Sequence, residues 1–137
     1  MTQSTVLVTG AGGFVGSAVV RALVAAAHEG SARLADGSQV ERVVAVLRPG
    51  GVTDRLETVT SSPLLTLVEA DVTEPTLEDA LAQHRPTAVV HTALPATAHE
   101  RFDRERTLAP LRAAFSALAK VEGARIVHAG SAWTLAP

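Results

Sequence analysis

Short runs of apolar, mostly β-branched residues recur along the chain and are separated by stretches with helical spacing. The apolar residues in these runs are consecutive rather than alternating, which is typical of parallel strands covered on both faces. Five strands are predicted, at residues 5–9, 42–47, 65–69, 87–92 and 125–129. Helices are predicted between them, at residues 13–28, 52–59, 76–83 and 110–121. Such alternation with short connections predicts an α/β fold with a doubly wound parallel sheet.

Two local features refine this outline. Pro110 is predicted in the first turn of its helix, where its missing N–H costs nothing. Residues 29–39, around Asp36-Gly37-Ser38, form a polar, turn-rich insert between the first helix and the second strand. We expect this insert to be a surface loop with a short hairpin.

The composition mainly excludes classes of protein and kinds of site. Hydrophobic residues make up 47% and charged residues 19% of the 137 residues, which indicates one soluble globular domain. A net charge of −2 gives no basic surface for nucleic acid or membrane lipid. Cysteine is absent, no histidine pair has metal-ligand spacing, and we expect no metal site. The polar start and the lack of a long apolar span predict a cytoplasmic protein.

A glycine-rich segment follows the first predicted strand and opens the first predicted helix. It reads Thr9-Gly10-Ala11-Gly12-Gly13-Phe14-Val15-Gly16. A pyrophosphate needs backbone N–H groups directed at it from a helix N-terminus, with no Cβ in the way. Gly10 can supply the tight turn, Gly13 the close approach and Gly16 the helix–sheet contact. The alternative is a glycine-rich turn without a ligand, which is disfavoured because glycines cost stability unless something uses them.

Only the pattern T-G-x-x-G-x-x-G fits this segment in full. With it, the chain resembles the extended short-chain dehydrogenase/reductase superfamily, the NAD(P)-dependent epimerase/dehydratase and reductase group. Later segments resemble that family in the same order, at residues 43–48, 69–73, 89–93 and 126–132. The resemblance covers nearly the whole chain and implies a Rossmann fold with strand order 3-2-1-4-5.

The resemblance also implies which residues would contact a cofactor. Asp71 would hydrogen-bond the adenine amino group, and residues 91–93 would line the ribose and nicotinamide side. The full implied set is Thr9, Gly10, Gly12, Gly13, Phe14, Val15, Gly16, Arg48, Asp71, Val72, His91, Thr92 and Ala93. His91 and His128 lie within predicted strands, so core or strand-end roles are the alternative for them.

The end of the second strand indicates which nicotinamide cofactor is used. An NAD site needs a carboxylate there, and an NADP site needs a cation for the 2′-phosphate. Asp36 satisfies a simple count but lies in the insert before the strand, which itself ends in Leu47-Arg48. Arg48 offers a bidentate phosphate clamp that Arg55 can join, so we expect NADP(H) in preference to NAD(H). The alternative for Arg48 is a solvated charge.

The resemblance implies a catalytic serine at Ser131, where the family polarises the substrate oxygen; a plain strand-end serine is the alternative. The family also uses a tyrosine, assisted by a lysine, to move the proton while the nicotinamide takes or gives hydride. The sequence has no tyrosine, and its one lysine, Lys120, precedes the fifth strand as a surface residue. Two functions follow. One is an extended short-chain reductase or epimerase/dehydratase acting at a carbonyl or secondary alcohol of a small-molecule substrate. The other is a non-catalytic NADP(H)-binding sensor or partner subunit.

We expect residues 1–131 to form an NAD(P)-binding domain and residues 132–137 to begin a further segment. Ile126 and Val127 would lose cover worth about 1.5–3 kcal/mol each if fully exposed, and a terminal parallel strand would be a bare edge. Either the chain is a portion of a longer polypeptide with a substrate lobe, or a second copy or partner chain covers that edge.

Overall fold

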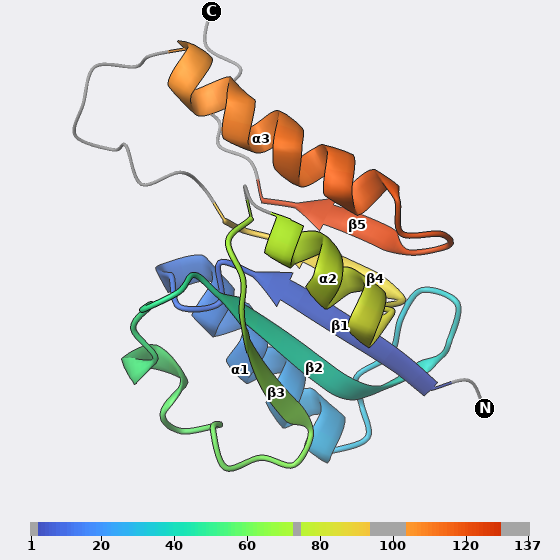
Figure 1. The fold of residues 1–137 in the computed structure, drawn as a ribbon. Coiled ribbons are helices and arrows are strands. Elements are labelled where there is room, and N and C mark those ends of the chain that lie inside the picture. The colour runs from blue at the N-terminus through green and yellow to red at the C-terminus, as the bar shows by residue number, and fades with distance from the viewer. Residues whose placement is uncertain (1–2, 73–74, 94–103, 130–137) are drawn as a thin grey trace, which may run out of the picture.

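The computed structural model describes residues 3–72, 75–93 and 104–129, and within these a five-stranded parallel sheet separates two helical layers (Figure 1). The strand order is β3-β2-β1-β4-β5, and every neighbouring pair is parallel. The strands are β1 (Gln3–Thr9), β2 (Gln39–Leu47), β3 (Leu65–Glu69), β4 (Ala88–His91) and β5 (Arg125–His128). The predicted fold class and strand order are confirmed.

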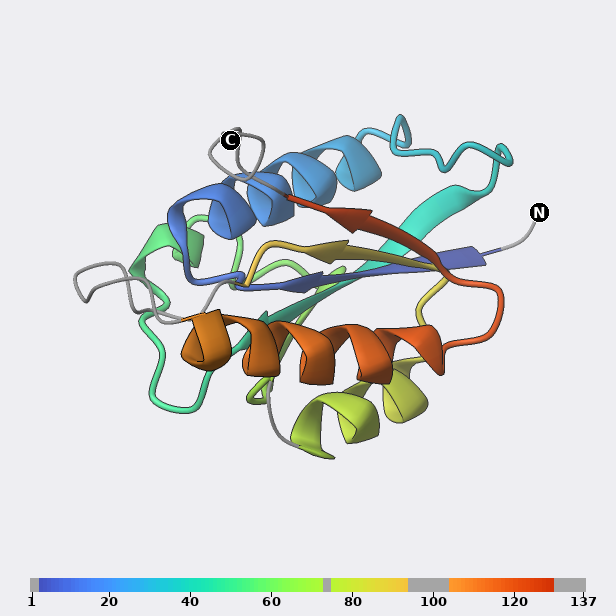
Figure 2. The same cartoon turned by 90° about the horizontal axis from the view of Figure 1, so that it is seen from above.

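Helices cover both faces of the sheet (Figure 2). These are α1 (Phe14–His28) on the first face, and α2 (Pro75–His84) with α3 (Arg104–Ala119) on the second. In β1, Val6 and Val8 belong to the core on the α1 side, whereas Leu7 belongs to the core under α2 and α3. Successive side chains of a strand point to opposite faces, so the consecutive apolar residues reflect burial on both faces.

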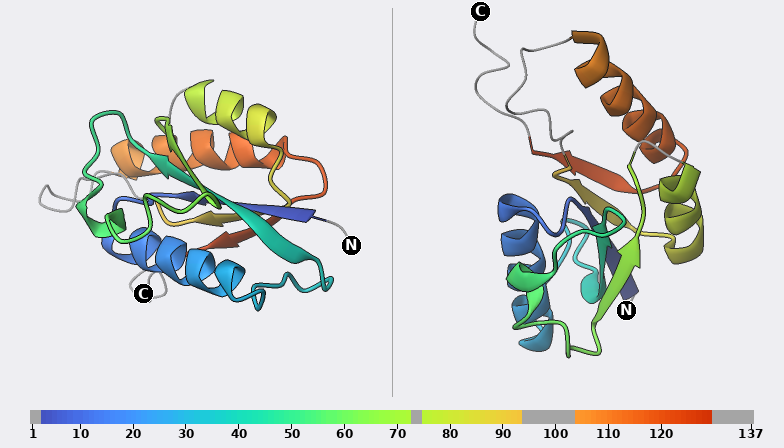
Figure 3. Two further views of the ribbon diagram at one scale, coloured as in Figure 1. Left: turned by 90° about the horizontal axis from the view of Figure 1, so that it is seen from below. Right: turned by 60° about the vertical axis from the view of Figure 1, so that its left-hand side comes forward.

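β5 differs from the inner strands because it lies at an edge of the sheet (Figure 3). All of its residues are exposed, including Ile126 at 40% and Val127 at 61%. Phe115 of α3 contacts His128, so that helix packs against one face of the strand. Ile126 and Val127 are therefore partly covered, and the full exposure considered for them is not reached.

Two predicted helices are wrong in extent. Residues 52–59 form only a short 3-10 helix, η1 (Asp54–Leu56), followed by turns. Leu56 alone is fully buried there, and one anchor does not hold a longer amphipathic helix. The last helix begins at Arg104, so Pro110 lies inside it and not in its first turn. The preceding residues include good helix formers, which extend the helix past the missing proline N–H.

The insert between α1 and β2 contains the expected hairpin. Arg33 and Gln39 form an antiparallel bridge, and the N–H of Leu34 donates to the carbonyl oxygen of Ser38 at 2.9 Å. Gly37 takes the left-handed conformation that the turn needs, with φ of +84°. This surface hairpin lies at the amino end of β2, away from the predicted cofactor contacts.

Candidate functional site

The predicted site residues gather where β1 and β4 end side by side. Thr9 is the last residue of β1, and it pairs in register with His91, the last residue of β4. The strand order reverses at this pair. From β1 the sheet continues to β2 and β3 on one side, and to β4 and β5 on the other side. In open α/β sheets, ligands bind in the crevice outside the carboxyl ends of the strands at such a reversal.

The glycine-rich loop turns the chain from β1 into α1 at this point. Gly10 has φ of +64°, and the N–H of Gly13 donates to the carbonyl oxygen of Gly10 at 3.0 Å. Gly13 is the N-cap and offers no side-chain cap, and the first turn of α1 holds no acidic residue. The first N–H groups of a helix have no partner within it, and the helix dipole makes that end positive. The start of α1 is therefore suited to an anion.

Different reasons account for glycine at the four glycine positions of the loop. A Cβ at Gly16 would overlap the carbonyl oxygen of Gly10. A Cβ at Gly10 would lie 2.8 Å from the backbone nitrogen of Ala93, and one at Gly12 would lie 2.8 Å from the carbonyl oxygen of Val52. Those three are required by packing within the protein. A Cβ at Gly13 would meet only the Gly10 carbonyl oxygen, at 3.2 Å, so close approach of a ligand better explains that glycine.

The hydroxyl of Thr9 joins the ends of the two strands. Its Oγ1 accepts the backbone N–H of Thr92 at 3.2 Å and that of Ala93 at 3.4 Å. The same Oγ1 lies 2.7 Å from Nδ1 of His91. Because Oγ1 already accepts two amide hydrogens, its own proton is directed to Nδ1, which leaves the proton of neutral His91 on Nε2. The site thus rests on a buried hydroxyl–imidazole pair.

His91 lies beneath the site, with its side chain fully buried. Its ring stacks on His128 at 5.5 Å and meets Phe115 edge-on at 5.6 Å, and its Nε2 has no hydrogen-bond partner within the described part of the chain. Burial, and then the neighbouring His128, lower the pKa of His91 to about 4. The imidazole is therefore neutral near pH 7, and its visible role is to hold Thr9. Direct contact of His91 with a cofactor stays a prediction.

The segment after β2 packs over the glycine-rich loop. Arg48 directly follows β2 and is exposed. Nη1 of Arg55, in η1, donates to the carbonyl oxygen of Gly12 at 3.0 Å. A Cβ at Gly12 would also lie 3.1 Å from Leu47, the last residue of β2, so the end of that strand approaches the loop at the same glycine. Both predicted cations thus lie on the β2 side of the loop.

The remaining predicted contacts follow β3 and β4. The backbone N–H of Asp71 donates to Oγ1 of Thr76 at 3.0 Å, which links the end of β3 to the first turn of α2. Val72 packs against the core under α2 and α3. Phe14 and Val15 project outward from the loop and are 82% and 53% exposed. Ser131 lies outside the described residues, as do residues 132–137.

Sequence reasoning missed how Thr92 contacts the loop. It identified Thr92 as a contact of the cofactor, but its Oγ1 donates to the carbonyl oxygen of Thr9 at 2.7 Å and lies 3.5 Å from that of Gly10. Only its place, directly after the buried strand and one residue beyond His91, the register partner of Thr9, could have indicated this bond.

The sequence model of the NAD dependent epimerase/dehydratase family matches residues 6–136. The chain belongs to this family. No curated protein matches the sequence. Among solved structures, the Helicobacter pylori ADP-L-glycero-D-manno-heptose-6-epimerase is 22% identical with a TM-score of 0.67, over 95% of this chain and 40% of its own. Yeast methylglyoxal/isovaleraldehyde reductase complexed with NADPH is 18% identical with a TM-score of 0.67, over 93% and 37%.

A third family structure is the dTDP-glucose 4,6-dehydratase of Streptomyces venezuelae, with NAD bound. It is 25% identical to this chain with a TM-score of 0.65, over 90% of this chain and 38% of its own. The chain therefore spans well under half the length of each of these structures. The two likenesses at lower identity establish the shared fold, while the family match establishes membership.

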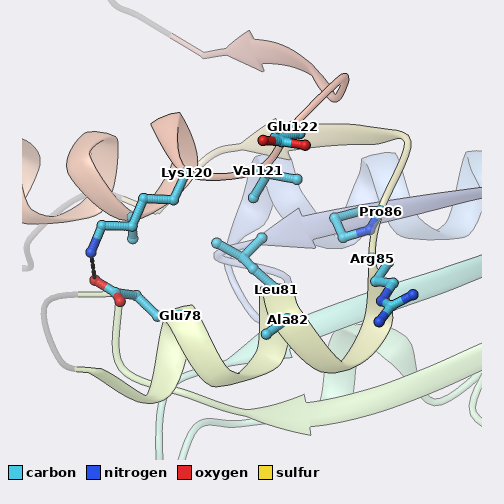
Figure 4. A pocket seen from close by; sticks show the side chains of 9 residues that line it. Glu78, Leu81, Ala82, Arg85, Pro86, Lys120, Val121 and Glu122 are labelled. Carbon is cyan, nitrogen blue, oxygen red and sulfur yellow. Dashed lines mark hydrogen bonds and ion pairs between the residues drawn. The ribbon is translucent and has the colours of Figure 1, made fainter.

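A hollow of about 530 Å³ lies between α2 and α3, near the amino ends of the strands (Figure 4). Arg85 and Pro86 line it just before β4, and Glu122 lines it just before β5. Lys120 and Glu78 form an ion pair of 2.9 Å across its rim. Because it lies at the amino ends of the strands, it is separate from the candidate site.

The described residues contain neither a metal-binding cluster nor a membrane-spanning helix. No group of three or more histidine, cysteine or acidic side chains there could hold a metal ion. No helix within residues 3–72, 75–93 and 104–129 is long and apolar enough to cross a membrane.

Proposed function

We propose that this chain is the NADP(H)-binding part of an extended short-chain reductase or epimerase/dehydratase that transfers hydride at a carbonyl or secondary alcohol. The observation that carries the proposal is the uncapped start of α1 at Gly13, where a Cβ would meet only one described atom within 4 Å, the carbonyl oxygen of Gly10. The family match and the NAD or NADPH in the related structures support it.

A dinucleotide fits the groups present at this edge of the sheet. The backbone N–H groups at the start of α1 would bind its diphosphate. The guanidinium groups of Arg48 and Arg55 would bind a 2′-phosphate, and Asp71 would face the adenine. Thr92 and Ala93 follow β4 on the side where the nicotinamide would lie. When bound, the nicotinamide accepts or supplies the hydride.

The protein would bring the substrate to this hydride. Ser131 would donate a hydrogen bond to the substrate oxygen and so stabilise negative charge that develops there. The sequence holds no tyrosine to move the proton, so in this proposal that proton donor belongs to a part of the enzyme outside these residues. The substrate would be a small molecule, and the location would be cytoplasmic.

A second candidate is a non-catalytic NADP(H)-binding sensor or subunit. The observation that favours it is the exposed edge at β5, where Val127 is 61% exposed. In this alternative, a second copy or a partner chain covers the edge. Consumption of NADPH in the presence of carbonyl compounds supports the enzyme, whereas tight binding without turnover by the native protein supports the sensor.

The test of the cofactor assignment is calorimetric titration with NADPH and NADH. Arg48→Asp should weaken NADPH binding about tenfold, because it replaces a charge-assisted phosphate contact with repulsion. It should change NADH binding by less than about twofold, and so should the control Arg112→Asp, an exposed residue of α3, for either nucleotide. Equal losses of NADPH and NADH in Arg48→Asp would contradict the preference for NADP(H).

Gly13→Val tests the phosphate loop itself. A branched side chain would occupy the space assigned to the diphosphate, so neither nucleotide should bind, while the protein should still unfold cooperatively because a Cβ there meets only the carbonyl oxygen of Gly10, at 3.2 Å. Retained binding in this variant would place the nucleotide elsewhere. No affinity of the unmodified protein for any adenine dinucleotide would overturn the proposed function.

A further inference from the structure

We infer that Thr92 is a positioning residue for the glycine-rich loop, and that its hydroxyl holds the left-handed turn at Gly10 in the form that receives a diphosphate. This inference rests on the proposed function and explains how the binding loop is held before a ligand arrives. It assigns Thr92 a role through the loop, in addition to its predicted place beside the nicotinamide.

The hydroxyl of Thr92 lies where β1 turns into the loop. Its Oγ1 donates to the carbonyl oxygen of Thr9 at 2.7 Å and lies 3.5 Å from the carbonyl oxygen of Gly10. A Cβ built on Gly10 would lie 2.8 Å from this Oγ1, and a Cβ on Gly16 would lie 2.7 Å from it. The hydroxyl therefore fits against both glycines, at the point where the loop crosses the start of α1.

The backbone of the same residue reinforces this contact. The N–H of Thr92 donates to Oγ1 of Thr9 at 3.2 Å, while the hydroxyl of Thr92 donates to the backbone carbonyl of Thr9. The two threonines are thus joined by reciprocal bonds between the side chain of each and the backbone of the other. Thr9 is held in turn by His91. The direction of the chain entering Gly10 is therefore fixed from β4 and not by the loop alone.

The other end of the same strand pair provides a matched control. Oγ1 of Thr87 donates to the carbonyl oxygen of Thr5 at 3.1 Å and accepts the N–H of Thr5 at 3.2 Å. It is again a threonine bridge between β1 and the β4 segment, but it lies at the amino end of the strands, far from the glycines. Removing that hydroxyl should weaken strand pairing without disturbing the loop.

The experiment compares Thr92→Val, Thr92→Ser and Thr87→Val by calorimetry with NADPH and with 2′-AMP, which lacks the diphosphate. Thr92→Val should weaken NADPH binding about tenfold, since one partly buried hydrogen bond orients the binding groups. Binding of 2′-AMP should change by less than about twofold. Thr92→Ser keeps the hydroxyl and should restore most of the NADPH affinity, and Thr87→Val should leave both affinities unchanged. Equal losses for NADPH and 2′-AMP, or no loss for either, would overturn the inference.

Amide hydrogen exchange in the ligand-free protein separates this inference from the proposed function. Thr92→Val should speed exchange of the amides of residues 10–13 several-fold, and Thr87→Val should not. Unchanged exchange there would overturn the role of Thr92 whatever the ligand result. Faster exchange in a protein that binds no dinucleotide would sustain the positioning role and reject the proposed function. If Thr92→Val does not fold, Thr92→Ala carries the same comparison.

Discussion

β1 and β5 are built from similar apolar residues, but their surroundings differ. In β1, Leu7 and Val8 are fully buried, whereas in β5 Ile126 and Val127 are 40% and 61% exposed. β1 has a strand on each side and helices over both faces, while among the described strands β5 has β4 alone beside it. A run of consecutive apolar residues therefore indicates that a strand can be buried on both faces. It does not identify which elements or chains bury it.

The two faces of β5 also differ from each other in how far they are covered. Val127 pairs in register with Val90, which packs with the core on the α1 side, and Ile126 pairs with Val89 of the opposite core. Phe115 and His128 show that α3 reaches one of these faces. The more exposed Val127 lies on the other face. The comparison thus predicts that substitutions in β1 cost far more stability than equivalent ones in β5.

The largest difference is expected for truncation to alanine. Leu7→Ala removes a fully buried side chain and should lower the free energy of unfolding by about 3 kcal/mol. Ile126→Ala should cost about 1 kcal/mol or less, because much of that side chain is already in water. Urea unfolding followed by circular dichroism measures both. Similar losses would show that β5 is covered in solution, for instance by another copy of the chain.

The pH dependence of stability tests whether the buried imidazole of His91, at the end of β4, is held neutral. The pKa of His91 is about 4 in the folded chain, below its ordinary 6.5, so the unfolded chain takes up the proton first as the pH falls. The stabilising effect of neutral His91 is complete above pH 6.5 and is lost between pH 6.5 and 4. That loss should be on the order of 2 kcal/mol.

Urea unfolding at several pH values measures this slope. His91→Gln removes the titrating group and should flatten the curve in that window. His84→Gln, at the end of α2, serves as the control and should leave the slope as it is. If the slope survives in His91→Gln, another group must carry the acid sensitivity.

The smallest effect is expected for a polar substitution on the edge strand. Val127→Thr should change the free energy of unfolding by no more than about 0.5 kcal/mol. Val8→Thr places the same hydroxyl in a fully buried position and should cost about 1–3 kcal/mol. Thermal unfolding of the two variants compares them directly. A cost at Val127 equal to that at Val8 would contradict the exposure of β5.

Features specified by residues near one another in sequence were predictable. The glycine-rich loop and the strand–helix alternation follow from local spacing, and the family resemblance supplied the strand order. The extent of α3 was not predictable from Pro110 alone. In the sequence, a proline inside a helix cannot be told from a proline in the first turn of a helix. The segment after β2 was predicted as a helix at residues 52–59, but it forms a 3-10 helix at Asp54–Leu56 followed by turns.

Features made by distant residues were harder to see. Arg55 reaches Gly12 across 43 positions, and Thr92 reaches Thr9 across 83. Both residues were identified as candidates for cofactor contact, but their bonds to the loop depend on how three strands align. The burial of His91 between Phe115 and His128 likewise depends on the docking of α3 and β5, which no local pattern states.

The bond between Thr9 and His91, which lie 82 positions apart, has a consequence for how the protein is made. Synthesis begins at the N-terminus, so the glycine-rich loop leaves the ribosome long before β4 does. Until β4 docks, the turn at Gly10 lacks the bonds that Thr92 makes to it, and closing so long a stretch of chain is slow and entropically costly. A nucleotide that binds only the finished loop would therefore stabilise the docked strands and assist the last steps of folding.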